Sequence, residues 1–151
     1  DARDGLGVRL DGEANRGLAY MFQLMNEARL AVGQQGVSTA GTAYEHALQY
    51  SKERTQGGKT LIIEYPDVRR MLMTMKAYVE GLRCLILESA LFLDLGWHHP
   101  EAHVREEYEG HLGLMTPICK AFGSDMGFRV TELAIQTYGG YPYIQDNPLE
   151  Q

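Results

Sequence analysis

The sequence predicts an all-α protein, an antiparallel bundle of three to four long helices. Apolar residues recur at helical spacing in three long stretches, at about 16–54, 66–96 and 116–138. Glycines or a proline stand at the ends of these stretches, where helices commonly stop and start. The one β-like run, LIIEY at 61–65, is too short to predict a sheet. Long helices joined by short connections favour a bundle.

The first predicted helix, from about Arg16 to Arg54, is unusually rich in small residues. Each glycine destabilises a helix interior by roughly 1 kcal/mol relative to alanine. Small residues allow a second backbone to approach closely, and we expect such an approach here. The residues concerned are Gly33, Gly36, Ala40, Gly41, Ala43 and Ala47.

The second predicted helix has clear signals at both ends. Gly57 and Gly58 break the first helix before it. Pro66 suits the first helical position, and Asp67 is favourable in the first turn because the helix N-terminus carries partial positive charge. Gly96 is the predicted end.

The third predicted helix follows a polar, histidine-rich connection at 97–113, which is expected to hold at most a short helix. Thr116 is predicted as the N-cap, with Pro117 at the first helical position. Gly139 and Gly140 close the helix.

Composition excludes several classes of protein. The chain has 151 residues, 44% of them hydrophobic, which fits one domain with a core. Its net charge of −6 argues against nucleic acid as a partner. No apolar run approaches the roughly 20 residues of a membrane helix.

The two cysteines and the start of the chain allow further predictions. Cys84 and Cys119 are predicted to be reduced, buried thiols. The start does not have the pattern of a signal peptide. It also lacks an initiator methionine, and for that reason we expect a piece of a longer chain.

Three histidines and three glutamates are concentrated near the end of the second helix. They are His98, His99, His103, Glu101, Glu106 and Glu107. These side chains could bind Zn²⁺ or Ni²⁺, but their spacing fits no closed structural site. A surface loop without a functional metal is the favoured interpretation.

The end of the third helix carries a first candidate binding site. Gln136 precedes Gly139 by three residues, and a helix that ends here leaves its last carbonyls open. Glycines at 139 and 140 allow a left-handed turn and let a ligand pack on bare backbone. The alternative is an ordinary C-cap with an exposed glutamine, and these residues alone favour that alternative.

The end of the first helix carries a second candidate. Arg54 lies beside the glycine-rich turn and could bind a phosphate through two parallel hydrogen bonds, helped by backbone N–H groups. The alternative is a helix C-terminus with favourable basic residues. The residues alone leave both interpretations open.

Four stretches together resemble one family. They are MNEARLAVGQQG at 25–36, YSKERTQGGK at 50–59, PDVRRMLMTMKAYVEGLR at 66–83, and KAFGSDMGFRVTELAIQTYGGYPYIQDNPLEQ at 120–151. In this order they resemble the C-terminal helical domain of flavin-dependent acyl-CoA dehydrogenases, especially the larger bacterial members. The most specific parts are Arg-x-Gln-Gly and Gln-x-x-Gly-Gly-Tyr. The resemblance implies a bundle domain at 16–151 that is incomplete at its C-terminus, with 1–15 as the linker from a preceding β-domain.

The resemblance also implies three groups of site residues. The segment that contacts the FAD pyrophosphate of a neighbouring subunit is matched by Arg54, Gln56 and Gly57. The turn that receives the other end of the same FAD is matched by Gln136, Gly139 and Gly140. The acyl-CoA site is lined at positions matched by Met25, Asn26 and Arg29.

Two departures from the family bear on chemistry. Pro142 stands where the family usually has glycine; it fixes φ and removes an N–H, so the turn is expected to differ. The family places its catalytic glutamate either on the first helix, where this chain has Ala28, or beyond Gln151. Glu27 lies about 100° around the helix from that position and is interpreted as a solvated carboxylate. No catalytic residue is therefore assigned, and the chain alone is not expected to be active.

For the full-length protein, the resemblance implies α,β-dehydrogenation of acyl-CoA thioesters in fatty acid metabolism of the bacterial cytoplasm. It implies FAD as cofactor, an electron-transfer flavoprotein or similar acceptor, and a homodimer or homotetramer in which small residues lie where bundle domains meet. The alternative is a helical interaction or scaffold module that kept the bundle and lost catalysis. The missing carboxylate and Pro142 favour that alternative, whereas the Arg54 and Gln136 segments favour cofactor binding.

Overall fold

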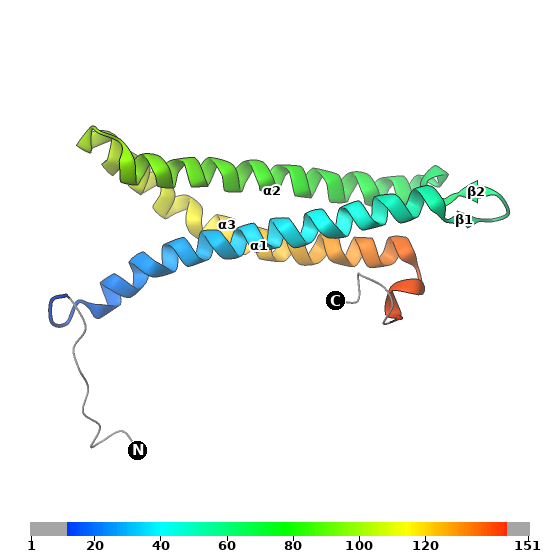
Figure 1. Ribbon diagram of the computed structural model, residues 1–151, viewed down its shortest axis with the longest axis horizontal. Helices are drawn as coiled ribbons and strands as arrows, with labels where there is room; N and C mark the ends of the chain where they lie inside the picture. The colour runs from blue at the N-terminus through cyan, green and yellow to red at the C-terminus, as the bar shows by residue number, and fades with distance from the viewer. Residues whose placement is uncertain (1–11, 145–151) are drawn as a thin grey trace, which may run out of the picture.

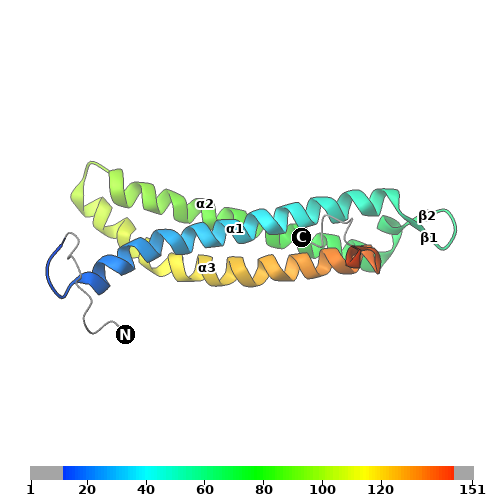
Figure 2. The same cartoon turned by 60° about the horizontal axis from the view of Figure 1, so that its bottom comes forward.

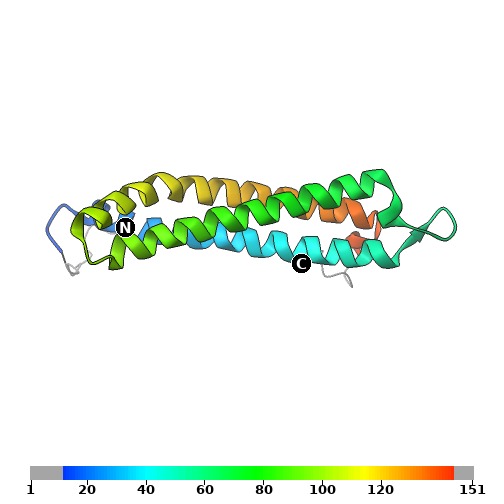
Figure 3. The same ribbon diagram turned by 90° about the horizontal axis from the view of Figure 1, so that it is seen from above.

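The computed structural model describes residues 12–144, and these form an elongated bundle of three long helices. The helices are α1 (Gly17–Glu53), α2 (Pro66–His98) and α3 (Ala102–Tyr138), each running antiparallel to the next (Figure 1). They remain side by side when the bundle is turned (Figures 2 and 3). The predicted all-α bundle is therefore confirmed.

A small hairpin joins α1 to α2. It consists of β1 (Thr55–Gln56) and β2 (Thr60–Leu61), paired antiparallel, and is followed by the 3₁₀ turn η1 (Ile62–Glu64). Its loop contains Gly57 at φ 64° and Gly58 at φ 105°, a conformation that glycine adopts without strain. The sequence predicted the break at these glycines but no strand, because two-residue strands leave no alternating pattern.

Close contact between α1 and α3 explains part of the small-residue row. A Cβ built on Gly36 would lie 2.3 Å from the carbonyl oxygen of Gly123, and one on Gly33 would lie 2.9 Å from that of Cys119. In return, Gly127 packs on the backbone of Gly36. The predicted close approach is confirmed at these positions, but the neighbouring backbone is α3 of the same chain rather than a second subunit.

The core fills the space between the three helices in two clusters. The first comprises Ala40, Ala43, Ala47, Met71, Leu72, Met75, Val79, Val130, Leu133 and Ala134. The second comprises Leu30, Val37, Leu82, Ile86 and Cys119. The Cys119 thiol lies 3.0 Å from the Ser89 hydroxyl in this buried region. Cys84 is exposed, so the prediction that both thiols are buried was wrong for Cys84.

The start of α3 was predicted wrongly. The helix begins at Ala102 and includes Pro117 in its interior. Proline lacks the N–H that would bond to Gly113, and α3 changes direction within its yellow part (Figure 1). Leu112, Thr116 and Cys119 form one buried stripe at helical spacing, and their packing outweighs the local preference of proline.

The connection between α2 and α3 is shorter than predicted. The second helix continues past Gly96 to His98, and only His99, Pro100 and Glu101 separate it from α3. Arg105 closes this turn by donating hydrogen bonds to the carbonyl oxygens of His99, at 2.6 Å, and Pro100, at 3.1 Å. The side chain of Arg105 thus provides donors for two carbonyls of the connecting turn.

Candidate functional site

The C-terminal ends of α1 and α3 lie together at the hairpin end of the bundle (Figures 1 and 2). A cleft of about 420 Å³ opens between them. Its lining residues are Tyr50, Arg54, Gln56, Ile62, Val68, Gln136, Thr137, Tyr138, Gly139, Gly140 and Tyr141. Five of the six predicted cofactor residues therefore share one cleft. Gly57, the sixth, lies next to Gln56 in the hairpin loop and is not among the lining residues.

Arg54 is held in place through its backbone. Its N–H donates to the carbonyl oxygen of Tyr50 at 2.9 Å, and its own carbonyl accepts from the N–H of Ile62 at 2.9 Å. These two bonds fix the point where α1 passes into the hairpin. The Arg54 side chain is exposed, and within residues 12–144 no carboxylate forms an ion pair with it. A guanidinium in this situation can bind a carboxylate or phosphate.

The turn after α3 depends on Gly139. This residue has φ 72° and ψ −126°, a conformation closed to residues with a Cβ, and its N–H donates to the carbonyl of Gln136 at 3.2 Å. Gly140, at φ −79°, has no such requirement. The chain then enters η2 (Tyr141–Tyr143), where Pro142 is buried. Proline fits the start of this 3₁₀ turn because the N–H there needs no intrahelical partner.

Three tyrosines line one side of the cleft. The rings of Tyr50 and Tyr138 are stacked, with centroids 3.9 Å apart and planes 11° from parallel. Tyr141 lies beside this stack, with centroids 6.2 Å and 6.5 Å from the other two. The Tyr138 hydroxyl donates to the carbonyl of His46 at 3.1 Å. Burial, followed by the nearby Tyr50, Glu53 and Tyr141, raises the pKa of Tyr138 above its ordinary value.

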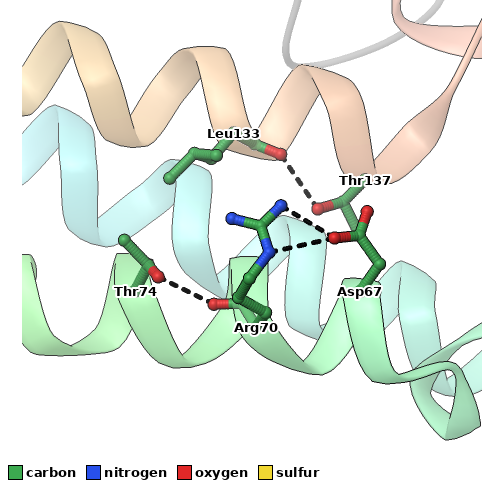
Figure 4. A network of polar contacts seen from close by, with 5 residues as sticks. All are labelled: Asp67, Arg70, Thr74, Leu133 and Thr137. Carbon is green, nitrogen blue, oxygen red and sulfur yellow. Dashed lines mark hydrogen bonds and ion pairs between the residues drawn. The ribbon is translucent and has the colours of Figure 1, made fainter.

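Other polar groups near the cleft bond within their own helices. The Thr137 hydroxyl donates to the carbonyl of Leu133 at 2.9 Å, and Arg70 contacts the Asp67 carboxylate at 2.8 Å (Figure 4). Among the described residues that line the cleft, Arg54 is the one charged residue. Because helix C-termini carry partial negative charge, the rest of the cleft favours hydrogen-bond donors, and an anionic group is expected to bind at Arg54.

The predicted substrate residues lie towards the other end of α1. Asn26 lines a second cavity of about 490 Å³ with Glu27, Leu93, Trp97, Glu109, Leu112 and Gly113. Met25 and Arg29 are not among these lining residues; by spacing, they share the helix face of Gly33 and Gly36. At 1.5 Å per residue, Asn26 and Arg54 are roughly 40 Å apart along the helix. One chain therefore does not bring the two predicted sites together.

The histidine-rich segment forms no metal cluster in the part of the chain described by the structure. His103 lies 3.4 Å from the Glu101 carboxylate, an exposed pair in which Nε2 faces an oxygen. None of the helices within residues 12–144 combines the length and the apolar composition that a membrane span requires.

The tyrosines were missed by the sequence analysis, although a signal was present. Tyr50 precedes Arg54 by four residues and therefore shares its helix face. Tyr138 and Tyr141 flank the glycine pair directly. Tyrosines close to both motifs indicate that the aromatic rings could pack together where the two motifs meet.

These features define a helical bundle domain with a cleft where two of its helices end. The sequence model of the family "Acyl-CoA dehydrogenase, C-terminal domain" matches residues 15–151. The chain belongs to this family, which confirms the resemblance of its motifs.

Among curated relatives, the chain is 40% identical to 3-methylmercaptopropionyl-CoA dehydrogenase of Ruegeria pomeroyi, over 94% of this chain and 25% of that protein. It is 38% identical to the broad-specificity linear acyl-CoA dehydrogenase FadE5 of Mycobacterium tuberculosis, with the same coverage of 94% and 25%. The chain thus spans about a quarter of the length of these relatives.

Solved structures show the same fold. Butyryl-CoA dehydrogenase of Megasphaera elsdenii superposes with a TM-score of 0.76 at 26% identity, covering 92% of this chain and 33% of that one. A chain from a structure named for the electron transferring flavoprotein of Acidaminococcus fermentans gives a TM-score of 0.77 at 27% identity, with coverage of 92% and 33%.

Proposed function

We propose that this chain is the C-terminal helical domain of an FAD-dependent acyl-CoA dehydrogenase and that the cleft at Arg54 binds part of FAD. The main support is the meeting of two motifs far apart in the sequence, Arg-x-Gln-Gly and Gln-x-x-Gly-Gly, in one cleft. An ordinary helix C-cap would not require this meeting.

The residues of the cleft fit part of a dinucleotide. The Arg54 guanidinium matches a pyrophosphate in charge and geometry. Gln56, Gln136 and the bare backbone at Gly139 and Gly140 offer donors and acceptors for hydroxyl and amino groups. The cleft volume of about 420 Å³ lies in the usual range for ligand sites, but the rest of FAD must bind elsewhere.

The proposed enzyme converts acyl-CoA thioesters to their α,β-unsaturated forms. Bound FAD would supply the acceptor for the hydride that leaves the β-carbon of the substrate. This chain would bind and orient the cofactor through Arg54 and the turn at 136–140. Asn26, with Met25 and Arg29, would line the acyl-CoA site. No residue of the chain is proposed as the base that removes the α-proton.

The length of α1 supports an assembly of subunits. Arg54 and Asn26 are roughly 40 Å apart along the helix, a span longer than FAD. One chain therefore cannot offer both to the same cofactor and substrate. The cleft of one subunit would instead complete the FAD site of its neighbour in a homodimer or homotetramer.

Exposed apolar side chains also support burial against further protein. Leu24 is 69% exposed, Leu87 62% and Phe128 76%, and they come from all three helices. Large apolar side chains this exposed, present on every helix, are expected if faces of the bundle pack on other domains or subunits.

The assembly can be tested by mixing subunits. Full-length Arg54→Ala protein and full-length Arg29→Ala protein should each have low activity. Hybrids of the two contain some sites with both residues intact, so mixing after dissociation should restore part of the activity. If mixing restores none while hybrids form, the cleft does not serve a neighbouring subunit.

The names of the relatives support the substrate class and the acceptor. They act on 3-methylmercaptopropionyl-CoA, linear acyl-CoA and butyryl-CoA. We therefore propose a short or linear acyl-CoA as substrate, although a relative of lower identity, 29%, is named for the cyclic cyclohexane-1-carbonyl-CoA. The structure that includes an electron transferring flavoprotein supports such a flavoprotein as electron acceptor.

A scaffold without catalysis is the second candidate, favoured by Ala28 at a position where some relatives carry the base. Visible absorbance of the purified full-length protein distinguishes the two. Bound flavin at about one per subunit supports the dehydrogenase. A colourless protein that also fails to bind added FAD supports the scaffold.

A further inference from the structure

Tyr138 makes two separate contacts that tie the end of α3 to α1. Its ring stacks on Tyr50 at a centroid distance of 3.9 Å, and its hydroxyl donates to the carbonyl of His46 at 3.1 Å. His46 lies one helical turn before Tyr50. The side chain of Tyr138 is therefore held along α1 over a full turn, which restricts both its position and its direction.

These contacts lie between the two motifs that meet in the cleft. Tyr50 is four residues before Arg54 on the same helix face. On α3, Tyr138 follows Gln136 by two residues and directly precedes Gly139, where the backbone reverses at φ 72°. Any change in the distance between Tyr50 and Tyr138 would therefore move the two motifs relative to each other.

Helix ends are the parts of a helix most prone to fraying, and both walls of this cleft are helix ends. The hydrogen bond from the Gly139 N–H to the Gln136 carbonyl joins two residues at the end of α3. It therefore does not connect the end of α3 to the end of α1. The Tyr138 side chain does connect the walls. A ligand with contacts on both walls binds more tightly when their spacing is fixed in advance.

We propose that Tyr138 is a positioning residue, which sets the spacing between the Arg54 guanidinium and the turn at 136–140 through its stack on Tyr50 and its bond to His46. This inference rests on the proposed function, because the ligand that needs this spacing is FAD. Tyr138 acts through Arg54 and the turn, and its effect on FAD binding therefore depends on Arg54.

The test measures the dissociation constant of FAD from the full-length protein. Tyr138→Leu removes both ring stacking and the hydroxyl, and Tyr138→Phe removes only the hydroxyl. Tyr78→Leu is the matched control: Tyr78 is half-buried, packs edge-on against Phe122 at 6.4 Å between α2 and α3, and does not line the cleft. Each change is also made in the Arg54→Ala background.

Tyr138→Leu should weaken FAD binding about tenfold, from the usual strength of an aromatic pair. Tyr138→Phe should restore affinity to within about twofold or threefold of the unmodified protein, because it keeps the stack. Tyr78→Leu should change affinity by less than about twofold. In the Arg54→Ala background, Tyr138→Leu should have little further effect, since residues that act through one contact are not additive.

Four outcomes contradict the inference and identify what failed. If Arg54→Ala weakens FAD binding but Tyr138→Leu does not, the positioning role is wrong and the proposed function stands. If Tyr138→Leu and Tyr78→Leu weaken binding equally, Tyr138 only stabilises the bundle. If Tyr138→Leu has its full effect without Arg54, Tyr138 acts by its own contact with FAD or by stabilising the bundle, and the positioning role is wrong. If the unmodified protein does not bind FAD, the proposed function and this inference are both wrong.

Discussion

Gly36 of α1 and Gly123 of α3 are in direct backbone contact, so close that a Cβ on Gly36 would lie 2.3 Å from the Gly123 carbonyl oxygen. Gly36→Ala must therefore push the helices apart, and we expect it to lower the free energy of unfolding by about 1–3 kcal/mol. Urea unfolding of the chain, followed by circular dichroism, measures this change.

Gly81→Ala in α2 is the control for that substitution. Gly81 is also inside a helix, but a Cβ there would meet no atom within 4 Å. Alanine should raise the free energy of unfolding by about 0.5–1 kcal/mol, because it reduces the freedom of the unfolded chain. Equal effects at the two positions would contradict the tight crossing of α1 and α3.

Alanine substitutions at the two glycines after α3 should also have different effects on stability. Gly139 has φ 72°, whereas Gly140 has φ −79° and open space around it. Gly139→Ala should destabilise the chain by about 1–2 kcal/mol, and Gly140→Ala should be nearly neutral. Thermal unfolding of both variants compares them. A larger loss for Gly140→Ala would show that the turn has a different conformation.

Pro117 should destabilise α3. It lies in the helix interior, where it removes a hydrogen bond to Gly113 and bends the helix. Pro117→Ala is expected to raise the free energy of unfolding by about 1–3 kcal/mol, up to the full difference between proline and alanine in a helix. The free energy of unfolding is measured with denaturant. If it is lower in Pro117→Ala than in the unmodified chain, core packing depends on the bend.

Stability should depend on Tyr138 at high pH. Its pKa is raised above the ordinary value of 10.0, chiefly by burial, so the folded chain disfavours the tyrosinate. The resulting stability is complete below pH 10 and is lost as the pH rises through the folded pKa. Tyr138→Phe cannot ionise and should lose less stability between pH 9 and about pH 11. Parallel losses in both proteins would show that Tyr138 ionises equally in the folded and unfolded chain.

The sequence predicted the features that depend on local chemistry. Pro66 begins α2, the glycine pair at 57 and 58 forms the hairpin loop, and Gly139 ends α3. Each of these residues has a backbone preference that neighbouring residues do not override.

Features that depend on packing between helices could not be read from the sequence. Pro117 has the local preference of a helix start, but the buried stripe around Thr116 keeps it inside α3. The small residues predicted a close approach without identifying Gly123 as the partner. The stacking of Tyr50 on Tyr138 depends on how α1 and α3 are aligned, and that alignment follows from the whole core.

The affinity of FAD for full-length Arg54→Ala protein tests the proposed function most directly, with Arg70→Ala as control. Arg70 is an exposed arginine at the same end of the bundle, but it contacts Asp67 and does not line the cleft. If Arg54 binds the pyrophosphate, Arg54→Ala should weaken FAD binding by about 10–100-fold, the loss expected for a charged hydrogen bond. Arg70→Ala should leave it unchanged. Equal FAD affinity in the Arg54→Ala, Arg70→Ala and unmodified proteins would contradict a cofactor site in this cleft.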